Sequence, residues 1–302
     1  MIRERTFSLP GLTLAAQEWG DPGGEPVLAL HGWLDNSASF QALAPLLPGA
    51  HIVALDLAGH GRSGHRPGAG PYNIWEDVSE LFEVADQLGW NQFSILGHSR
   101  GGIIGMIAAG TFPERITRLA LIEALWPEVH QPREAPRQLA RSILEMRSLR
   151  TKPLSVYRDL ELAAKARARG MFPLSIGAAE ALTQRGTKRV ADGYSWSTDQ
   201  RLLAPSAVKL TEDYIEAFLA CATADMAMIL GRDGIPRLFS HYREALQRFP
   251  ERLDWIELPG GHHLHLESQA PQVADCLRRF FNGQALGWHG PSEPLPRSGD
   301  PI

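Results

Sequence analysis

Cysteine is scarce in this sequence, which has only Cys221 and Cys276 among its 302 residues. A disulfide framework is therefore not indicated, and both residues are expected to be small members of the core. Long apolar runs are lacking too. No stretch approaches the roughly 20 residues that span a bilayer, and the first residues contain no unbroken apolar segment of signal-peptide length. These absences predict a cytoplasmic protein without a membrane partner.

An excess of charge of one sign is also missing. Lys and Arg number 30 and Asp and Glu 34, which gives a formal net charge of −4. This balance gives no reason to expect nucleic acid or an anionic membrane as a partner. With 44% hydrophobic and 21% charged residues, the composition is that of an ordinary soluble globular protein. The length suits one large α/β domain or two smaller ones.

What the sequence does contain is an alternation of short apolar runs and amphipathic stretches. The runs are rich in Val, Ile, Leu and Phe and predict buried strands at 27–30, 52–57, 93–97 and 119–125. Helical patterns lie between them at 38–47, 73–88 and 100–111. This order predicts a mostly parallel sheet with crossover helices on both faces. Two earlier strands, 3–9 and 12–18, meet at a Pro-Gly turn and are expected to form an antiparallel hairpin at one edge.

The alternation is interrupted after residue 126 and resumes near residue 224. Strand-like runs return at 224–231 and 253–260, with helices expected near 236–249 and 270–281. The simplest interpretation is an α/β core, 1–125 and 223–282, interrupted by a helical cap at 126–222. Residues 283–302 are crowded with proline and glycine and are expected to be a loosely held tail.

The most informative segment is FSILGHSRGG, residues 93–102. A buried strand runs into Gly97-His98-Ser99-Arg100-Gly101, and a helical pattern follows at once. The motif G-x-S-x-G needs glycine on both sides because side chains there would collide with neighbouring backbone. It holds the serine strained and exposed, above a helix N-terminus that favours developing negative charge. A structural Gly-Ser-Gly turn is the alternative, but the strand–turn–helix context favours Ser99 as a nucleophile.

Such a nucleophile needs two amides that stabilise an oxyanion. One follows the serine directly, which here is the amide of Arg100, and the other comes from the loop after an earlier strand. Trp33 stands in that loop, after His31-Gly32, and is the natural second donor, with its indole as part of a pocket wall. Simple core packing is the alternative role for the Trp33 ring. We expect Asp35 or Asn36 to cap the helix at 38–47 and assign the Arg100 side chain no role.

Together these segments resemble the α/β-hydrolase superfamily. The resemblance rests on His31-Gly32 after a strand, on D-x-x-G-x-G-x-S at 56–63 and on GHSRGG at 97–102, in the superfamily's order. HGWLDNSASF and GGHHLHLE resemble most closely the serine hydrolase-like subgroup. The resemblance implies a mostly parallel eight-stranded sheet with an inserted cap and a catalytic triad. It also implies that the loop 56–63 is structural and borders the site.

The base of such a triad is expected in LPGGHHLHLESQAP, residues 258–271. In related hydrolases the base directly follows a glycine, with a glutamate five positions later and a proline soon after. His262 fits, since Gly261 precedes it and Glu267 follows at that spacing. His263 and His265 are then packing or supporting residues. A metal site is the other interpretation of H-H-x-H, but no cysteine or carboxylate cluster in the sequence clearly completes one, and no metal is expected.

Two carboxylates compete for the role of the triad acid. Most of the superfamily carries it after the strand here at 224–231, as glycine, two residues and aspartate. This chain has glycine at that position, with Asp233 one residue early. Some relatives take the acid from the end of the strand after the nucleophile helix, where Glu123 interrupts the apolar run LALIEALWP. Pairing with His262 would explain a buried glutamate there, so Glu123 is favoured over Asp233. The alternatives are a salt bridge from Glu123 to a nearby arginine and a turn aspartate at Asp233.

These parts predict hydrolysis of a carboxylic ester through an acyl-enzyme, without a cofactor. A thioester, a lactone, a carbon–carbon substrate or perhydrolysis would use the same triad, and a non-catalytic binding protein on this fold is the alternative of another class. We expect a small-molecule substrate with an apolar acyl or alcohol part, and a homo-oligomer is left open. Trp33, Trp126, Trp196 and the apolar stretch 171–174 are candidates for the pocket wall, although helix packing is the favoured role for Met171-Phe172. The cap's arginines are expected to form a solvated helix face.

Overall fold

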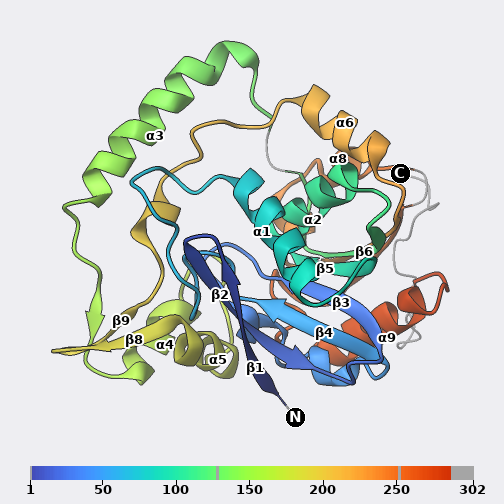
Figure 1. The fold of residues 1–302 in the computed structure, drawn as a ribbon, viewed down its shortest axis with the longest axis horizontal. Coiled ribbons are helices and arrows are strands. Elements are labelled where there is room, and N and C mark those ends of the chain that lie inside the picture. The colour runs from blue at the N-terminus through green and yellow to red at the C-terminus, as the bar shows by residue number, and fades with distance from the viewer. Residues whose placement is uncertain (1, 127–128, 251–252, 287–302) are drawn as a thin grey trace.

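The computed structural model describes residues 2–126, 129–250 and 253–286. A single sheet with the strand order β1-β2-β4-β3-β5-β6-β10-β11 runs through the core (Figure 1). Its strands are β1 (Arg3–Leu9), β2 (Leu12–Trp19), β3 (Glu25–Leu30), β4 (Ala50–Leu55), β5 (Phe93–His98), β6 (Ile116–Ile122), β10 (Asp225–Gly231) and β11 (Leu253–Leu258). In this sheet the neighbouring strands among β4, β3, β5, β6, β10 and β11 pair in parallel. β1 and β2 form an antiparallel hairpin at one edge, and β2 pairs antiparallel with β4. The predicted eight-stranded, mostly parallel sheet and its edge hairpin are therefore confirmed.

The sheet separates two hydrophobic layers. Along β3 the side chains alternate between them, because successive residues of a strand point to opposite faces. Leu28 and Leu30 pack with the first layer, and Val27 and Ala29 with the second. The first layer is covered by α1 (Ile74–Gln87), α2 (Arg100–Thr111) and α6 (Glu212–Cys221), and the second by α9 (Ala270–Phe281) and the short 3₁₀ turns η1 (Ser37–Phe40) and η2 (Ala44–Leu46).

Two of the predicted helices are shorter than expected. The stretch 38–47 forms η1 and η2 in place of one helix, with a proline inside the second. The stretch 236–249 divides into α7 (Ile235–Leu238) and α8 (Tyr242–Leu246). Cys276 is buried in α9 as predicted, whereas Cys221 is exposed at the end of α6, which corrects the expectation of a core residue.

The inserted segment contains more than the predicted helices. It holds α3 (Ala135–Leu149), α4 (Leu160–Ala168), α5 (Ile176–Gly186) and a three-stranded antiparallel sheet of β7 (Val156–Tyr157), β9 (Gly193–Trp196) and β8 (Thr187–Val190). A short 3₁₀ turn, η4 (Gln200–Leu203), follows β9. In Figure 1 the small sheet lies beside α4 and α5, away from α3. The last helix of the segment, α6, packs on α2, where the backbone of Phe218 comes close to Gly110.

Only the first part of the predicted tail falls in the described part of the chain. Leu286 is buried against the second hydrophobic layer, and its amide donates to Asp254 Oδ2 at 2.5 Å. The remainder, 287–302, lies outside the described residues. Among the helices of residues 2–126, 129–250 and 253–286, none has the length and apolarity needed to cross a membrane.

Candidate active site

Ser99 stands in the turn between β5 and α2. Its backbone has φ 50° and ψ −119°, a left-handed conformation that few residues other than glycine adopt. The Ser99 amide donates to Ile122 O at 3.0 Å, and its carbonyl accepts from the Gly102 amide at 2.9 Å. The turn is therefore fixed by the neighbouring strand β6 and by the first turn of α2. It carries the strain that the sequence predicted at this motif.

The glycines of the motif are required by close backbone contacts. A Cβ atom at Gly101 would lie 2.1 Å from Leu30 O, and one at Gly97 would lie 2.5 Å from the Cα of Gly102. Neither neighbour is a side chain that could turn away. Alanine at either position would therefore push apart β3, β5 and α2 at the point where Ser99 is held.

Trp33 and Arg100 both lie near the nucleophile: Trp33 lines a cavity together with Ser99, and Arg100 follows Ser99 directly. Trp33 follows β3, and Arg100 is the first residue of α2, so its amide has no partner within the helix. Within the described part of the chain, neither amide donates a hydrogen bond to another group. Trp33 is 43% exposed, and its indole Nε1 donates to Leu202 O at 2.9 Å, so it is not a core residue. The Arg100 guanidinium pairs with Asp77 on α1, away from the serine.

His31 fixes the loop that carries the Trp33 amide. Its Nδ1 donates to Gly32 O at 2.7 Å, and its Nε2 accepts from the Leu57 amide at 3.0 Å. Burial lowers the pKa of His31 from its ordinary value, against the opposing effects of the Gly32 carbonyl and nearby carboxylates. A neutral imidazole is the form that can donate at one nitrogen and accept at the other. His31 therefore joins the loop after β3 to the loop after β4.

Glu123 and His262 meet in the structure. β6 ends at Ile122, and Glu123 follows it with φ 49°, a second strained residue next to the serine turn. The carboxylate is buried, and its Oε2 lies 2.9 Å from His262 Nδ1. The amides of Gly231 and Ile235 donate to its two oxygens at 2.6 and 2.8 Å. The glutamate that interrupts the apolar run thus has a full set of buried partners, as its burial requires.

Gly234 accounts for the position of this carboxylate. A Cβ atom at Gly234, where most of the superfamily has aspartate, would lie 2.1 Å from Glu123 Oε2. The glutamate therefore occupies the space that a side chain at residue 234 would fill. Asp233 is elsewhere: its side chain is 65% exposed and lies 3.6 Å from Arg237, as the turn-aspartate alternative anticipated. Of the two candidate acids, the structure brings Glu123, and not Asp233, to His262.

The His262 ring is covered by the inserted segment. Phe172 lies between α4 and α5 and stacks on it with 3.9 Å between ring centroids and 23° between ring planes. The expectation that Met171 and Phe172 are helix-packing residues is wrong, because Met171 is 80% exposed and Phe172 packs on the imidazole. Within the described residues, Ser99 Oγ makes no hydrogen bond to His262, a contact that tightens in many hydrolases when substrate binds. Both side chains line the same two cavities.

Comparisons with known proteins assign the family. The model of the alpha/beta hydrolase fold family matches residues 25–269. The chain belongs to the α/β-hydrolase family.

Among the relatives of this α/β-hydrolase are serine hydrolase-like proteins. Serine hydrolase-like protein 2 of Homo sapiens is 33% identical over 93% of this chain and 94% of its own length. A probable serine hydrolase of Drosophila melanogaster is 28% identical over 92% of this chain and 87% of its own. The crystal structure of a hypothetical protein from Pseudomonas aeruginosa PAO1 has a TM-score of 0.89 at 44% identity and covers 92% of this chain and 99% of that one. The resemblance to the serine hydrolase-like subgroup is thereby confirmed.

A second polar cluster of the hydrolase, around Asp35, is not evident in the sequence. Asp35 caps no helix, and it is Asn36 whose side chain accepts from the Ala38 amide in η1. The Asp35 carboxylate accepts from Arg167 Nη2 at 2.6 Å and from His263 Nε2 at 3.0 Å. Burial would raise the pKa of Asp35, but the charges of His263 and Arg167 and the hydrogen bond from His263 hold it well below its ordinary value. Arg167 is one of the cap arginines expected on a solvated helix face. It instead connects the inserted segment to the loop that carries Trp33.

His98, the residue before the nucleophile, belongs to the same cluster. Its Nε2 donates to His262 O at 2.9 Å, and its Nδ1 lies 3.8 Å from Asp35 Oδ2. Burial, followed by the three neighbouring histidines of the 262–265 segment, lowers the pKa of His98 well below its ordinary value. The backbone of His262 is therefore supported by a neutral, fully buried imidazole beneath the nucleophile turn.

The ligand atoms of Asp35, His98 and His263 lie within 4.8 Å of one another, so a carboxylate does join the histidines, contrary to the sequence-based expectation. The donors around Asp35 give the cluster another interpretation. Both Asp35 oxygens already accept hydrogen bonds, one of them from the Arg167 guanidinium. A cation next to this fixed positive charge would be disfavoured. We therefore interpret the cluster as a hydrogen-bond network and assign no metal.

The loop 56–63 is structural in the hydrolase, as its resemblance to the superfamily implied. The buried Asp56 carboxylate accepts from the amides of Ser37 and Arg62, both at 2.8 Å. It also pairs with Arg185 of α5, whose Nε lies 2.9 Å from both oxygens. This ion pair is a second connection between the core and the insertion.

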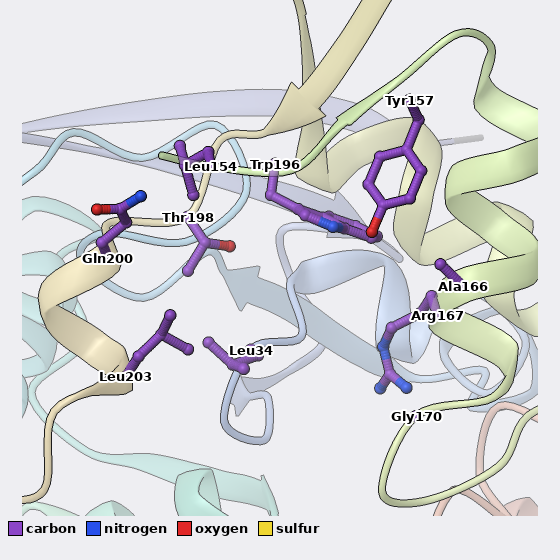
Figure 2. Close-up of a pocket in the computed structure, with 10 residues that line it drawn as sticks. All are labelled: Leu34, Leu154, Tyr157, Ala166, Arg167, Gly170, Trp196, Thr198, Gln200 and Leu203. Atoms are coloured by element: carbon purple, nitrogen blue, oxygen red, sulfur yellow. The ribbon is translucent and has the colours of Figure 1, made fainter. Parts of the chain in front are cut away.

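Three cavities adjoin the site. One of about 780 Å³ contains Ser99 and His262 and extends past Trp126 to α7 and α8. A second, of about 240 Å³, contains the same two residues and runs along Trp33 and Leu34. A third, also about 240 Å³, shares Leu34, Arg167 and Gly170 with the second and ends at Trp196 (Figure 2). The three predicted tryptophans thus each line one cavity, and Ser99 lies where two of them meet.

Proposed function

We propose that this protein is a serine hydrolase that cleaves a carboxylic ester through an acyl-enzyme, with Ser99 as nucleophile, His262 as general base and Glu123 as the acid of the triad. The observation that carries the proposal is the buried hydrogen bond of 2.9 Å between Glu123 Oε2 and His262 Nδ1, beside a serine in a strained strand–helix turn. A carboxylate that accepts from Nδ1 leaves Nε2 as the nitrogen that receives a proton.

The proposed reaction uses these groups in two halves. Ser99 Oγ attacks the ester carbonyl while His262 Nε2 takes its proton, and Glu123 stabilises the resulting imidazolium. The amides of Trp33 and Arg100 donate to the oxyanion that forms on the carbonyl oxygen. His262 then returns the proton to the departing alkoxide, which leaves the acyl group on Ser99. Water then attacks the acyl group on Ser99 in the same way, with His262 again as the base, and the carboxylic acid product is released. No cofactor is needed for either half.

The test is the hydrolysis of p-nitrophenyl butyrate by wild type, Glu123→Gln and Asp233→Asn, with Ser99→Ala as the blank. Loss of the triad acid should lower kcat about 10⁴-fold, the size of the effect in serine proteases. Asp233→Asn is the matched control because its carboxylate is exposed and lies near Arg237 instead of His262. Collapse of Asp233→Asn together with survival of Glu123→Gln would overturn the assignment of the acid.

Labelling with a fluorophosphonate separates this proposal from a non-catalytic role on the same fold. An activated Ser99 should be labelled in wild type and not in Ser99→Ala, because the probe reacts with an activated serine. Folded wild-type protein that neither takes the label nor hydrolyses any ester would favour a binding protein. A thioester or lactone substrate would instead leave labelling intact and shift activity to those compounds.

A further inference from the structure

The cavity of Figure 2 lies next to the proposed catalytic centre, and the inserted segment forms most of its wall. Leu34 is its contribution from the core, and Trp196, Leu154 and Leu203 add apolar surface. It shares Leu34, Arg167 and Gly170 with the cavity that contains Ser99, so the two cavities are direct neighbours. A substrate bound at Ser99 that passes these three residues would enter it.

Tyr157, Thr198 and Arg167 bring hydrogen-bond donors to this mainly apolar space. Figure 2 shows the Tyr157 hydroxyl directed past the Trp196 ring toward Arg167, and the Thr198 hydroxyl directed into the cavity from the other side. Among the described residues, neither hydroxyl makes a hydrogen bond, although each lines the cavity. A few convergent polar groups in an apolar pocket are typical of a site that fixes the orientation of a ligand.

Arg167 is the charged member of this group. Its Nη2 is held by Asp35 at 2.6 Å and lies 3.4 Å from His263 Nε2. Within the described part of the chain, Nε and Nη1 make no hydrogen bond, and they are not among the buried atoms left without a partner. These donors are therefore accessible, and Arg167 lines both this cavity and the one that contains Ser99. A planar guanidinium offers five N–H groups, so Asp35 can hold Nη2 while Nε and Nη1, which lie on opposite sides of the group, can each still donate a hydrogen bond to a carboxylate oxygen.

We propose that this cavity binds a carboxylate at the end of the substrate, held by Arg167 with Tyr157 and Thr198, so that the substrate is a monoester of a dicarboxylic acid or an ester of an ω-hydroxy acid. The proposal rests on the proposed ester hydrolysis and adds its substrate class. An apolar chain would run from Ser99 past Leu34, and its carboxylate would accept a hydrogen bond from Nε or Nη1 of Arg167. Asp35 contributes by holding the guanidinium in place before the substrate arrives.

The experiment compares three p-nitrophenyl esters of equal chain length: the octanoate, the monoester of suberic acid and its ω-methyl ester. p-Nitrophenyl monoesters of adipic and sebacic acid vary the length of the chain between the ester and the carboxylate. Butyrate esters of ω-hydroxy acids place the carboxylate on the alcohol side of the ester. We expect kcat/KM to favour the carboxylate substrate over its methyl ester at one of these lengths. Arg167→Gln should lower that preference about 10- to 100-fold, the range for loss of a hydrogen bond to a charged group.

Arg169→Gln, which removes an equal charge from an exposed position just after α4, is the matched control and should keep the preference. Tyr157→Phe should lower it more modestly and serves if Arg167→Gln does not fold. Equal rates for the suberate monoester and its methyl ester at every length would overturn the proposal. An equal loss on all substrates in Arg167→Gln would also overturn it, because Arg167 would then act only through Asp35 on the loop of Trp33.

Binding to Ser99→Ala separates failure of this proposal from failure of the proposed hydrolysis. Trp196 lines the cavity, so monomethyl suberate should change the intrinsic fluorescence of this variant, and an added Arg167→Gln substitution should weaken that binding. If no ester is hydrolysed but this binding and its dependence on Arg167 remain, the carboxylate site stands while the hydrolysis does not. If monomethyl suberate and methyl octanoate bind equally, the site is refuted whatever the catalytic result.

Discussion

Gly234→Ala should inactivate the protein by displacing Glu123. The added Cβ would lie 2.1 Å from Glu123 Oε2, whereas unstrained contacts of this kind need more than about 3 Å, so the carboxylate must move by roughly an ångström. That movement breaks the hydrogen bond to His262 Nδ1 and weakens those from the amides of Gly231 and Ile235. Loss of the acid's position should lower kcat by about 10³- to 10⁴-fold. Buried amides left without an acceptor should cost about 2–4 kcal/mol of stability.

The assay is p-nitrophenyl ester hydrolysis combined with urea denaturation, measured as a double-mutant cycle. In a Glu123→Ala background the colliding atoms are gone, so Gly234→Ala should add little further loss of activity or stability. Gly177→Ala is the control: no atom lies within 4 Å of the new Cβ, and alanine within α5 should stabilise the helix by roughly 1 kcal/mol. Full activity of Gly234→Ala in the wild-type background, or equal losses in both backgrounds, would refute this reasoning.

Two further predictions concern the stability of the core. Burial lowers the pKa of His60, His98 and His265 well below the ordinary value, so the unfolded chain binds more protons below about pH 6.5. The free energy of unfolding should be highest above that pH. It should fall as the pH drops toward the folded-state pKa values, by about 1.4 kcal/mol per pH unit for each histidine. Equal free energies of unfolding in urea at pH 7.5 and 5.5 would contradict this. Arg185→Gln should cost about 3 kcal/mol because it breaks a buried ion pair between the core and α5. The exposed Arg189→Gln should cost less than about 0.5 kcal/mol in the same urea titration, and similar losses for both would show that burial of the pair is unimportant.

Parts of the site follow from the sequence because they depend on local order along the chain. The carboxyl ends of parallel strands meet at one edge of a sheet, so residues that follow β3, β5 and β6 must gather there. Ser99, Glu123 and the Trp33 loop each come directly after such a strand. The apolar run around Glu123 also signals that its carboxylate needs a buried partner.

Other parts depend on contacts between distant segments, which no local pattern reveals. Asp35 meets Arg167 across 132 residues and His263 across 228. From sequence spacing alone, an arginine in an amphipathic helix is indistinguishable from one on a solvated face. The strands of the small sheet have at most four residues each and are mainly half-buried or exposed, so they lack the apolar alternation that marks a strand.

The position of Glu123 has a consequence for how this protein could change its specificity. When the acid follows β10, the segment between β10 and β11 must keep its geometry for catalysis. Here that segment carries no proposed catalytic side chain, yet Leu238, Phe239 and Tyr242 within it form a wall of the cavity of about 780 Å³ that contains Ser99. Selection, natural or in the laboratory, can therefore change the side chains of this wall while the triad is left intact, as long as the backbone at 231–235 that holds Glu123 is kept. Divergence in substrate preference among proteins with this arrangement should concentrate there.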